Sequence, residues 1–293
     1  MQISIANGSF YGANKRESLY DLIVPNEWNG QLIVFLHGYM GYKDWGCWNL
    51  VQDYFTSQNF GFLKYNVSHN GGTPEKPIDF TDLEAFSTNS YSKEIEDFEA
   101  IIECISQHFD GMPIINVIGH SRGGGIALLQ SKNKSIHRIA SWAGISTIEK
   151  RFPVGKALSD WKQSGIRFLK NGRTKQNMPH SYSQYTDYLL HKERLNIENY
   201  CKTSEIPTLI VHGENDTSVL PSEAEALSTW LNTSLIIIKE TQHTFGSAQP
   251  WEKEQMPQAL ESACEITLSF FKRSSPGEIK TKKLTGQSRK RSR

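Results

Sequence analysis

The feature of this sequence that most constrains its fold is the alternation of short, mostly apolar runs with segments of helical periodicity. The unbroken apolar run at residues 32–36 is typical of a strand buried on both faces, and therefore of a parallel sheet. Further runs that predict strands lie at residues 62–67, 114–118, 139–145, 208–213 and 235–238. Apolar side chains at helical spacing fall at residues 48–55, 95–105, 124–129, 224–231 and 258–271. The alternation predicts an α/β fold with a doubly wound, mostly parallel central sheet and helices on both faces.

The chain ahead of the first buried run has a different pattern. Residues 3–6 and 18–24 predict two short strands, joined by a hairpin turn at residues 12–15. Further along, residues 73–89 are polar and predict a loop before the next helix.

The alternation breaks between residues 147 and 206 and resumes immediately afterwards. We therefore expect one domain over residues 1–272, with a small cap insertion at about 147–206 that lies over the functional edge of the sheet. Inside the insertion, the pair Asn171-Gly172 favours a tight hairpin.

Charge is distributed unevenly along the chain, which has 32 Lys and Arg, 31 Asp and Glu, and a formal net charge of +1. Residues 273–293 hold eight of the basic residues and one acidic residue, which leaves 24 basic and 30 acidic residues in the body. A body at −6 does not suit nucleic-acid binding. The tail at +7 is poor in apolar residues and predicts a disordered, solubilising segment.

Four cysteines are scattered without the spacing of a disulfide framework or a metal site, which favours reduced thiols. The first residues lack the basic and apolar regions of a signal peptide, and no stretch is apolar enough to span a membrane. We expect a cytoplasmic protein. The sequence also has no glycine-rich phosphate loop and no cluster of metal-ligating residues, so we expect no cofactor and no metal.

The sequence Gly-His-Ser-Arg-Gly at residues 119–123 lies between the apolar run 114–118 and the helical segment 124–129. Strand, Gly-x-Ser-x-Gly and helix, in this order, form the context that a nucleophile elbow requires. Ser121 must adopt a strained backbone conformation to lift its hydroxyl clear of the sheet edge. The flanking glycines keep strand and helix from colliding through their side chains.

A serine hydroxyl is a weak nucleophile near neutral pH, so it needs a base, and the base needs an orienting acid. Asp216 follows the apolar run at 208–213, and His243 follows the run at 235–238. Because the carboxyl ends of parallel strands meet at one edge of a sheet, we expect these side chains to converge with Ser121. Glu214, two residues before Asp216, is an alternative acid.

These residues give the sequence a resemblance to the α/β-hydrolase superfamily over nearly all of residues 1–272. The matching segments are His-Gly-Tyr at 37–39, the pentapeptide at 119–123, Gly-Glu-Asn-Asp at 213–216 and His-Thr-Phe-Gly at 243–246. The serine, the acid and the histidine follow one another in the superfamily's order. Within it, the chain is similar to the bacterial branch grouped with dienelactone hydrolases and serine aminopeptidases. The resemblance implies Ser121 as the nucleophile, His243 as general base and then acid, and Asp216 as the group that orients the imidazole.

The resemblance also implies an oxyanion hole made by the backbone N–H groups of Tyr39 and Arg122. Arg122 opens the helix after the elbow, where amides are unpaired and the helix dipole favours negative charge. This role uses only the backbone of Tyr39, so its ring is free to pack in the core. The side chain of His120 can serve only to support the elbow. In the loop at 65–72 the chain departs from the superfamily pattern, and His69 either lines the site or braces that loop.

The predicted cap carries eleven Lys and Arg against six Asp and Glu. Basic and aromatic side chains above a pocket suit an acyl or lactone substrate that carries a carboxylate. An aminopeptidase would instead need acidic groups to bind the substrate ammonium. Alternatively, the charged side chains only face solvent on the outer surface of the cap. We expect cap aromatics, Trp161 and Tyr185 among them, to line the substrate pocket.

These observations together predict a serine hydrolase that cleaves small carboxylic esters or lactones through an acyl-enzyme on Ser121. Two alternatives remain open at this stage. One is a peptidase or amidase that acts on small amides, and the other is a ligand-sensing protein of the same fold with negligible turnover.

Overall fold

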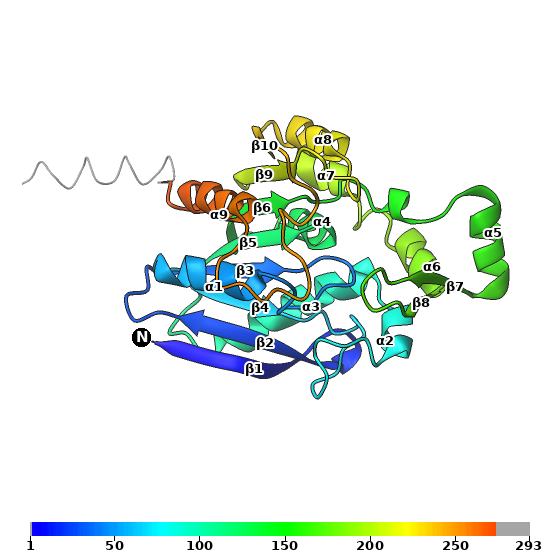
Figure 1. Cartoon of the computed structure of the whole chain (residues 1–293), viewed down its shortest axis with the longest axis horizontal. Helices are drawn as coiled ribbons and strands as arrows, with labels where there is room; N and C mark the ends of the chain where they lie inside the picture. The colour runs from blue at the N-terminus through cyan, green and yellow to red at the C-terminus, as the bar shows by residue number, and fades with distance from the viewer. Residues whose placement is uncertain (1, 274–293) are drawn as a thin grey trace, which may run out of the picture.

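The computed structural model describes residues 2–273, which form an eight-stranded sheet between two layers of helices (Figure 1). The order of strands across the sheet is β1-β2-β4-β3-β5-β6-β9-β10. The strands are β1 (Ile3–Tyr11), β2 (Glu17–Val24), β3 (Gln31–Leu36), β4 (Gly61–Tyr65), β5 (Ile114–His120), β6 (Ile136–Trp142), β9 (Thr208–Gly213) and β10 (Leu235–Ile238). Neighbours from β4 to β10 run parallel, and β2 pairs antiparallel with β1 and β4. The predicted doubly wound, mostly parallel sheet is therefore confirmed.

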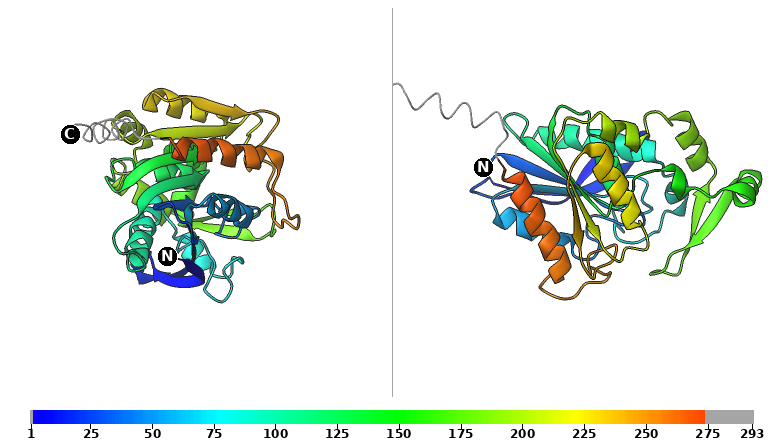
Figure 2. Two further views of the ribbon diagram at one scale, coloured as in Figure 1. Left: turned by 90° about the vertical axis from the view of Figure 1, so that its left-hand side faces the viewer. Right: turned by 90° about the horizontal axis from the view of Figure 1, so that it is seen from above.

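Helices cover both faces of this sheet, as Figure 2 shows. On one face, α1 (Trp48–Ser57) and α9 (Gln258–Phe271) bury their apolar stripes against β3, β4, β6 and β9. On the other face lie α3 (Tyr91–Ser106), α4 (Arg122–Leu129) and α8 (Pro221–Leu231), in a second apolar cluster. Most of the apolar positions that predicted α1, α3 and α8 from spacing are buried in them. In α9 the predicted stripe is only partly correct, because Ala263 and Phe270 are buried whereas Ala259 and Ile266 are half-buried.

The N-terminal hairpin is confirmed, although its first strand is longer than predicted. A short 3-10 turn, η1 (Ala13–Lys15), joins β1 and β2, with Asn14 in the left-handed region at φ 55°. Two of the differences from expectation have a clear local cause. Strand β6 ends at Trp142, because Ala143 at φ 47° turns the chain out of the sheet. The polar segment 73–89 contains a short helix, α2 (Leu83–Ser87), whose first turn is capped by the Asp82 side chain on the N–H of Ala85 at 2.9 Å.

The segment between β6 and β9 projects beyond the sheet edge (Figures 1 and 2). Its elements are η2 (Glu149–Arg151), α5 (Gly155–Ser164), β7 (Ile166–Lys170), β8 (Asn177–Ser181), α6 (Ser183–Leu190) and α7 (Ile197–Lys202). Strands β7 and β8 pair antiparallel as a separate two-stranded sheet. We refer to residues 147–206 as the cap.

The hairpin at Asn171-Gly172 exists, but it is not a tight turn. Six residues connect β7 to β8, and the N–H of Lys175 donates to the Asn171 carbonyl at 3.0 Å. The Asn171 side chain accepts hydrogen bonds from the N–H groups of Arg173 and Thr174, which stabilises this wider, helical turn. The left-handed residue that closes it is Lys175, at φ 61°, and not Gly172.

Within residues 2–273, the structure contains no helix long and apolar enough to cross a membrane. The four cysteines are unpaired. Apart from Arg273, the predicted basic tail lies outside the described residues.

Candidate active site

Ser121 occupies the turn between β5 and α4, with backbone angles of φ 58° and ψ −117°. Its N–H donates to the Trp142 carbonyl at 2.8 Å, which fixes the turn to the neighbouring strand. The two flanking glycines are needed for steric reasons. A Cβ at Gly119 would lie 2.2 Å from the Gly123 carbonyl oxygen, and a Cβ at Gly123 would lie 2.4 Å from that of Leu36. The local sequence therefore forms the elbow that the motif predicts.

The structure brings Ser121, His243 and Asp216 together at the carboxyl edge of the sheet. His243 Nε2 is 2.8 Å from Ser121 Oγ, and His243 Nδ1 is 2.7 Å from Asp216 Oδ2. With Nδ1–H donating to the carboxylate, Nε2 is the acceptor of the serine proton. This hydrogen-bonded chain has the geometry in which a histidine can act as a general base toward serine.

Asp216 is held as a buried carboxylate. Its Oδ1 accepts from the N–H groups of Ser218 at 2.8 Å and Val219 at 3.0 Å, and His212 Nε2 lies 3.3 Å from Oδ2. Burial opposes ionisation, but the hydrogen bonds from His212, His243 and the backbone outweigh it, and the pKa of Asp216 lies well below its usual range. Glu214, the alternative acid, is exposed, and its carboxylate accepts from the N–H of Glu240 at 3.0 Å.

Three further histidines near the site, His120, His37 and His69, are buried and take no part in the hydrogen bonds that link Asp216, His243 and Ser121. His120 Nε2–H donates to the His243 carbonyl at 3.0 Å, and burial together with the nearby His243 lowers the pKa of His120 to about 3. His37 accepts from the N–H of Val67 at 3.2 Å, and burial lowers its pKa to about 4. His69 contacts Ser68 Oγ at 2.8 Å, and burial lowers its pKa to about 4. His69 braces its loop and does not line the cavities at Ser121.

Tyr39 and Arg122 flank Ser121. Arg122 is the first residue of α4, and Tyr39 lies on the loop after β3. The preceding residue of that loop, Gly38, is so close to the elbow that a Cβ on it would lie 3.0 Å from Ser121 Cβ. The Tyr39 ring does not pack in the core, because it is 42% exposed and lines the cavity. The buried side chain of Arg122 pairs with Glu94 at 2.7 Å and lies 3.8 Å from the centre of the Tyr91 ring. Sequence reasoning missed this ion pair.

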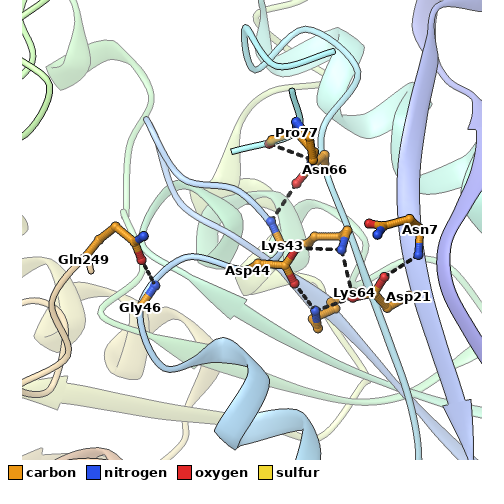
Figure 3. Close-up of polar contacts among 9 residues, drawn as sticks. All are labelled: Asn7, Asp21, Lys43, Asp44, Gly46, Lys64, Asn66, Pro77 and Gln249. Atoms are coloured by element: carbon orange, nitrogen blue, oxygen red, sulfur yellow. Dashed lines mark hydrogen bonds and ion pairs between the residues drawn. The ribbon is translucent and has the colours of Figure 1, made fainter. Parts of the chain in front are cut away.

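A buried cluster of charges anchors the loop that carries Tyr39 (Figure 3). The Lys43 ammonium lies 2.9 Å from Asp21 and 2.6 Å from Asp44, and Lys64 pairs with the same two carboxylates, at 2.5 Å from Asp21. The two positive charges balance the two negative ones, which is the condition for burying such groups. The signal in the sequence was Lys64, a lysine inside the apolar run 62–67.

Backbone contacts extend this anchor toward His243. The Lys43 N–H donates to the Asn66 side chain at 2.6 Å, and the Gly46 N–H donates to Gln249 at 2.5 Å (Figure 3). The Cys47 N–H donates to Ser247 Oγ at 3.0 Å. The loop after β3 and the loop that carries His243 are therefore fixed to each other.

Two cavities reach Ser121 and His243. One, of about 350 Å³, is covered by the cap. The cap residues that line this cavity are Arg151, Phe152, Arg167, Leu169, His180 and Gln184. The other, of about 400 Å³, lies on the side of Trp45, Trp48 and Ser247. The expectation for Trp161 and Tyr185 was wrong, because neither lines these cavities. Trp161 is only 1% exposed and packs with Phe152 and Tyr185 as the cap's own core, since the small insertion needs an apolar centre to hold its shape.

Comparison with known proteins identifies the fold. The sequence model of a family described as alpha/beta hydrolase fold matches residues 31–167. Est1E from Butyrivibrio proteoclasticus with bound ferulic acid superposes with a TM-score of 0.68 at 17% identity, covering 91% of this chain and 100% of that one. The acylaminoacyl peptidase of Pyrococcus horikoshii gives 0.61 at 16% identity, covering 93% of this chain and 41% of that one.

An esterase domain from a Rhodothermus marinus protein gives a TM-score of 0.59 at 15% identity, covering 92% of this chain and 97% of that one. A search of curated protein sequences found no match. The chain is an α/β-hydrolase-fold protein, as the sequence predicts. Its narrower similarity to dienelactone hydrolases and serine aminopeptidases stays a prediction.

Proposed function

We propose that this protein is a serine hydrolase that cleaves carboxylic esters or lactones through an acyl-enzyme on Ser121. The observation that carries the proposal is the chain of hydrogen bonds from Asp216 through His243 to Ser121, at the meeting point of two cavities. Esterases among proteins of similar fold are in accord with this chemistry.

In the first half of the reaction, Ser121 Oγ attacks the ester carbonyl carbon while its proton passes to His243 Nε2. The carbonyl oxygen becomes an oxyanion, and we assign its stabilisation to the backbone N–H groups of Tyr39 and Arg122. His243 then gives its proton to the alkoxide as the C–O bond breaks. The alcohol leaves, or in a lactone stays attached to the acyl chain.

In the second half, neutral His243 removes a proton from water, and the hydroxide formed attacks the acyl-enzyme. Collapse of the second tetrahedral intermediate returns the proton to Ser121 and releases the acid. Asp216 holds the imidazole in the required tautomer and stabilises its charged form; its low pKa keeps it ionised throughout. The loop network around Lys43 and Lys64 positions Tyr39, and the cap limits access of water to the cavity.

The proposal covers three further points that the sequence raises. We take the cap at 147–206 as a substrate-covering insertion of a single domain over 1–272. Four unpaired thiols suit a reducing compartment, and we propose the cytoplasm. We propose a small molecule as the substrate, and no nucleic acid, because the body of the chain is acidic.

A fluorophosphonate probe, used beside steady-state ester hydrolysis, tests the assignment. We expect stoichiometric labelling that disappears in Ser121→Ala and drops sharply in His243→Ala, because the hydroxyl then keeps its proton. Turnover of 4-nitrophenyl esters at ~1 per second or faster fits an enzyme.

Other outcomes identify the alternatives. Labelling with sustained turnover of aryl amides, beside that of esters, would indicate an amidase or peptidase, because the amide nitrogen leaves only when the site can protonate it. Labelling with a single slow turnover would establish a ligand sensor. Folded wild-type protein that the probe does not label, although the probe can reach the cavity, would refute the assignment of Ser121.

A further inference from the structure

We propose that the cavity under the cap contains an anion-binding subsite built on Arg167, so that the substrate is an ester with a carboxylate in its acyl or alcohol part. The inference rests on the proposed function and adds the substrate class to it. It follows from the balance of charge in the cavity, from the fixed position of Arg167, and from the neutral groups around it.

Three arginines line this cavity, and no aspartate or glutamate does so among the described residues. Two of the arginines are already neutralised. Arg122 pairs with Glu94 at 2.7 Å, and Arg151 pairs with the buried carboxylate of Glu223. Arg167 pairs with no carboxylate in the part of the chain that the structure describes. The cavity therefore carries one uncompensated positive charge.

Arg167 is fixed in this position by the cap. It alternates along β7 with its neighbours: Arg167 and Leu169 line the cavity, and Phe168 points the other way and is 59% exposed. The guanidinium lies 4.4 Å from the centre of the buried Trp161 ring. A planar guanidinium that stacks by its face leaves its N–H groups free to donate in its own plane. Its Nε is buried and has no acceptor among the described residues, which is costly unless a ligand supplies one.

The polar groups beside Arg167 are neutral. His180, its partner in the β7–β8 pair, donates a hydrogen bond from Nδ1 to the Met178 carbonyl at 3.0 Å. At Nε2 it accepts a hydrogen bond from the Tyr39 hydroxyl at 2.6 Å. Burial and the charge of Arg167 lower the pKa of His180 to about 4, and burial raises the pKa of the Tyr39 hydroxyl. Neither group can balance the guanidinium near neutral pH, so a bound anion is the missing partner. A substrate ammonium group, by the same reasoning, is disfavoured.

The test compares esters of similar length that differ in the charge of one terminal group. On the acyl side, mono-4-nitrophenyl adipate is compared with 4-nitrophenyl hexanoate and 4-nitrophenyl 6-aminohexanoate. On the alcohol side, 4-carboxyphenyl hexanoate is compared with 4-carbamoylphenyl hexanoate. We expect the wild type to prefer the anion in one of the two series by ~10-fold or more in kcat/KM, the scale of a charge-assisted hydrogen bond. The aminohexanoate should be the poorest of the acyl series.

Arg167→Gln should abolish this preference, so that the ratio of kcat/KM for the anionic and the neutral ester falls to about one, because the Gln amide carries no charge while its stem still covers Trp161. Arg167→Lys should retain part of the preference. Lys170→Gln is the matched control, because it removes the same charge from the same strand at an exposed position outside the cavity. It should keep the full preference.

Two results would overturn the inference while leaving the proposed function intact: hydrolysis of neutral esters with no anion preference in either series, or a preference that Arg167→Gln does not change. Loss of the neutral activity in Arg167→Gln with a folded core would reassign Arg167 to holding the cap, which also overturns the inference. Absence of hydrolysis and of Ser121 labelling in the wild type refutes the proposed function instead.

Discussion

The buried charge cluster under the Tyr39 loop should be the point at which a single substitution does most harm to stability. Lys64 is fully buried and contacts both Asp21 and Asp44. Lys64→Met keeps much of the side-chain volume but leaves two carboxylates to share the ammonium of Lys43. Removal of one partner from a buried ion pair costs about 3–5 kcal/mol of unfolding free energy. For a domain of this size that lowers Tm by roughly 6–20 °C.

A second substitution tests the cause. Lys64→Met combined with Asp44→Asn restores the balance of charge, and we expect it to recover at least half of the loss. Asp44 is the suitable partner, because its side chain is 24% exposed and tolerates a neutral amide better than Asp21 does. Lys156→Met is the control, since Lys156 pairs with Asp160 on an exposed helix face, and its removal should shift Tm by no more than about 1 °C.

The assay is thermal unfolding followed by circular dichroism, with urea titration of the same variants to obtain the free energy. Activity toward a neutral ester serves as a second readout, because the cluster anchors the loop that carries Tyr39, to which we assign one oxyanion donor in the proposed mechanism. A Lys64→Met variant within about 1 kcal/mol of the wild type would refute the reasoning. A double variant as unstable as the single one would show that lost packing, and not unbalanced charge, is the cause.

Three further predictions concern the triad, the cap and pH. Asp216→Asn should lower kcat by about 10³–10⁴-fold with Tm retained, and Glu214→Gln should be nearly silent; the reverse pattern, measured on one ester, would reassign the acid. Trp161→Ala should destabilise the cap and increase its cleavage in limited proteolysis, whereas unchanged protection with a new chain-length preference would restore Trp161 to the pocket. Tm should fall as the pH is lowered from about 6.5 to about 4, because histidines of the unfolded chain bind protons in this range and four buried histidines of the folded protein do not. The four are His37, His69, His120 and His180, each with a pKa lowered by burial. His69→Gln should make that fall shallower, and an unchanged slope would argue against the buried neutral state of His69.

The parts of the fold that could be predicted from the sequence are those set by local chemistry. The unbroken apolar run at 32–36 is best satisfied by burial on both faces, and the structure has β3 at Gln31–Leu36 with all five apolar side chains buried. The elbow was also predictable, since the pentapeptide at 119–123 needs glycines for a steric reason that holds within five residues. Strand β6 was misplaced by three residues because its end depends on a left-handed Ala143, a residue type that rarely marks a turn.

The remaining site features depend on partners far away in the sequence. Tyr39 and His180 are 141 residues apart, and nothing local to either one indicates their hydrogen bond. The excess of basic residues in the cap is visible in the sequence. Which arginine at the cavity lacks a carboxylate partner is not, because Arg122 and Arg151 pair with Glu94 and Glu223, which both lie outside the cap. Trp161 was assigned to the pocket for a similar reason: an aromatic residue in an insertion can face a substrate or its own core, and composition does not distinguish the two.

At position 121 the proposed catalytic role and the stability of the protein favour different residues. At φ 58° and ψ −117° a side chain is strained, by about 1–2 kcal/mol on general steric grounds, and only glycine adopts this conformation freely. The residue that would best suit the turn is therefore the one that has no hydroxyl. Directed evolution for heat resistance alone would favour glycine at position 121. Under the function that we propose, that change removes the nucleophile, so selection for turnover would be what keeps a serine there.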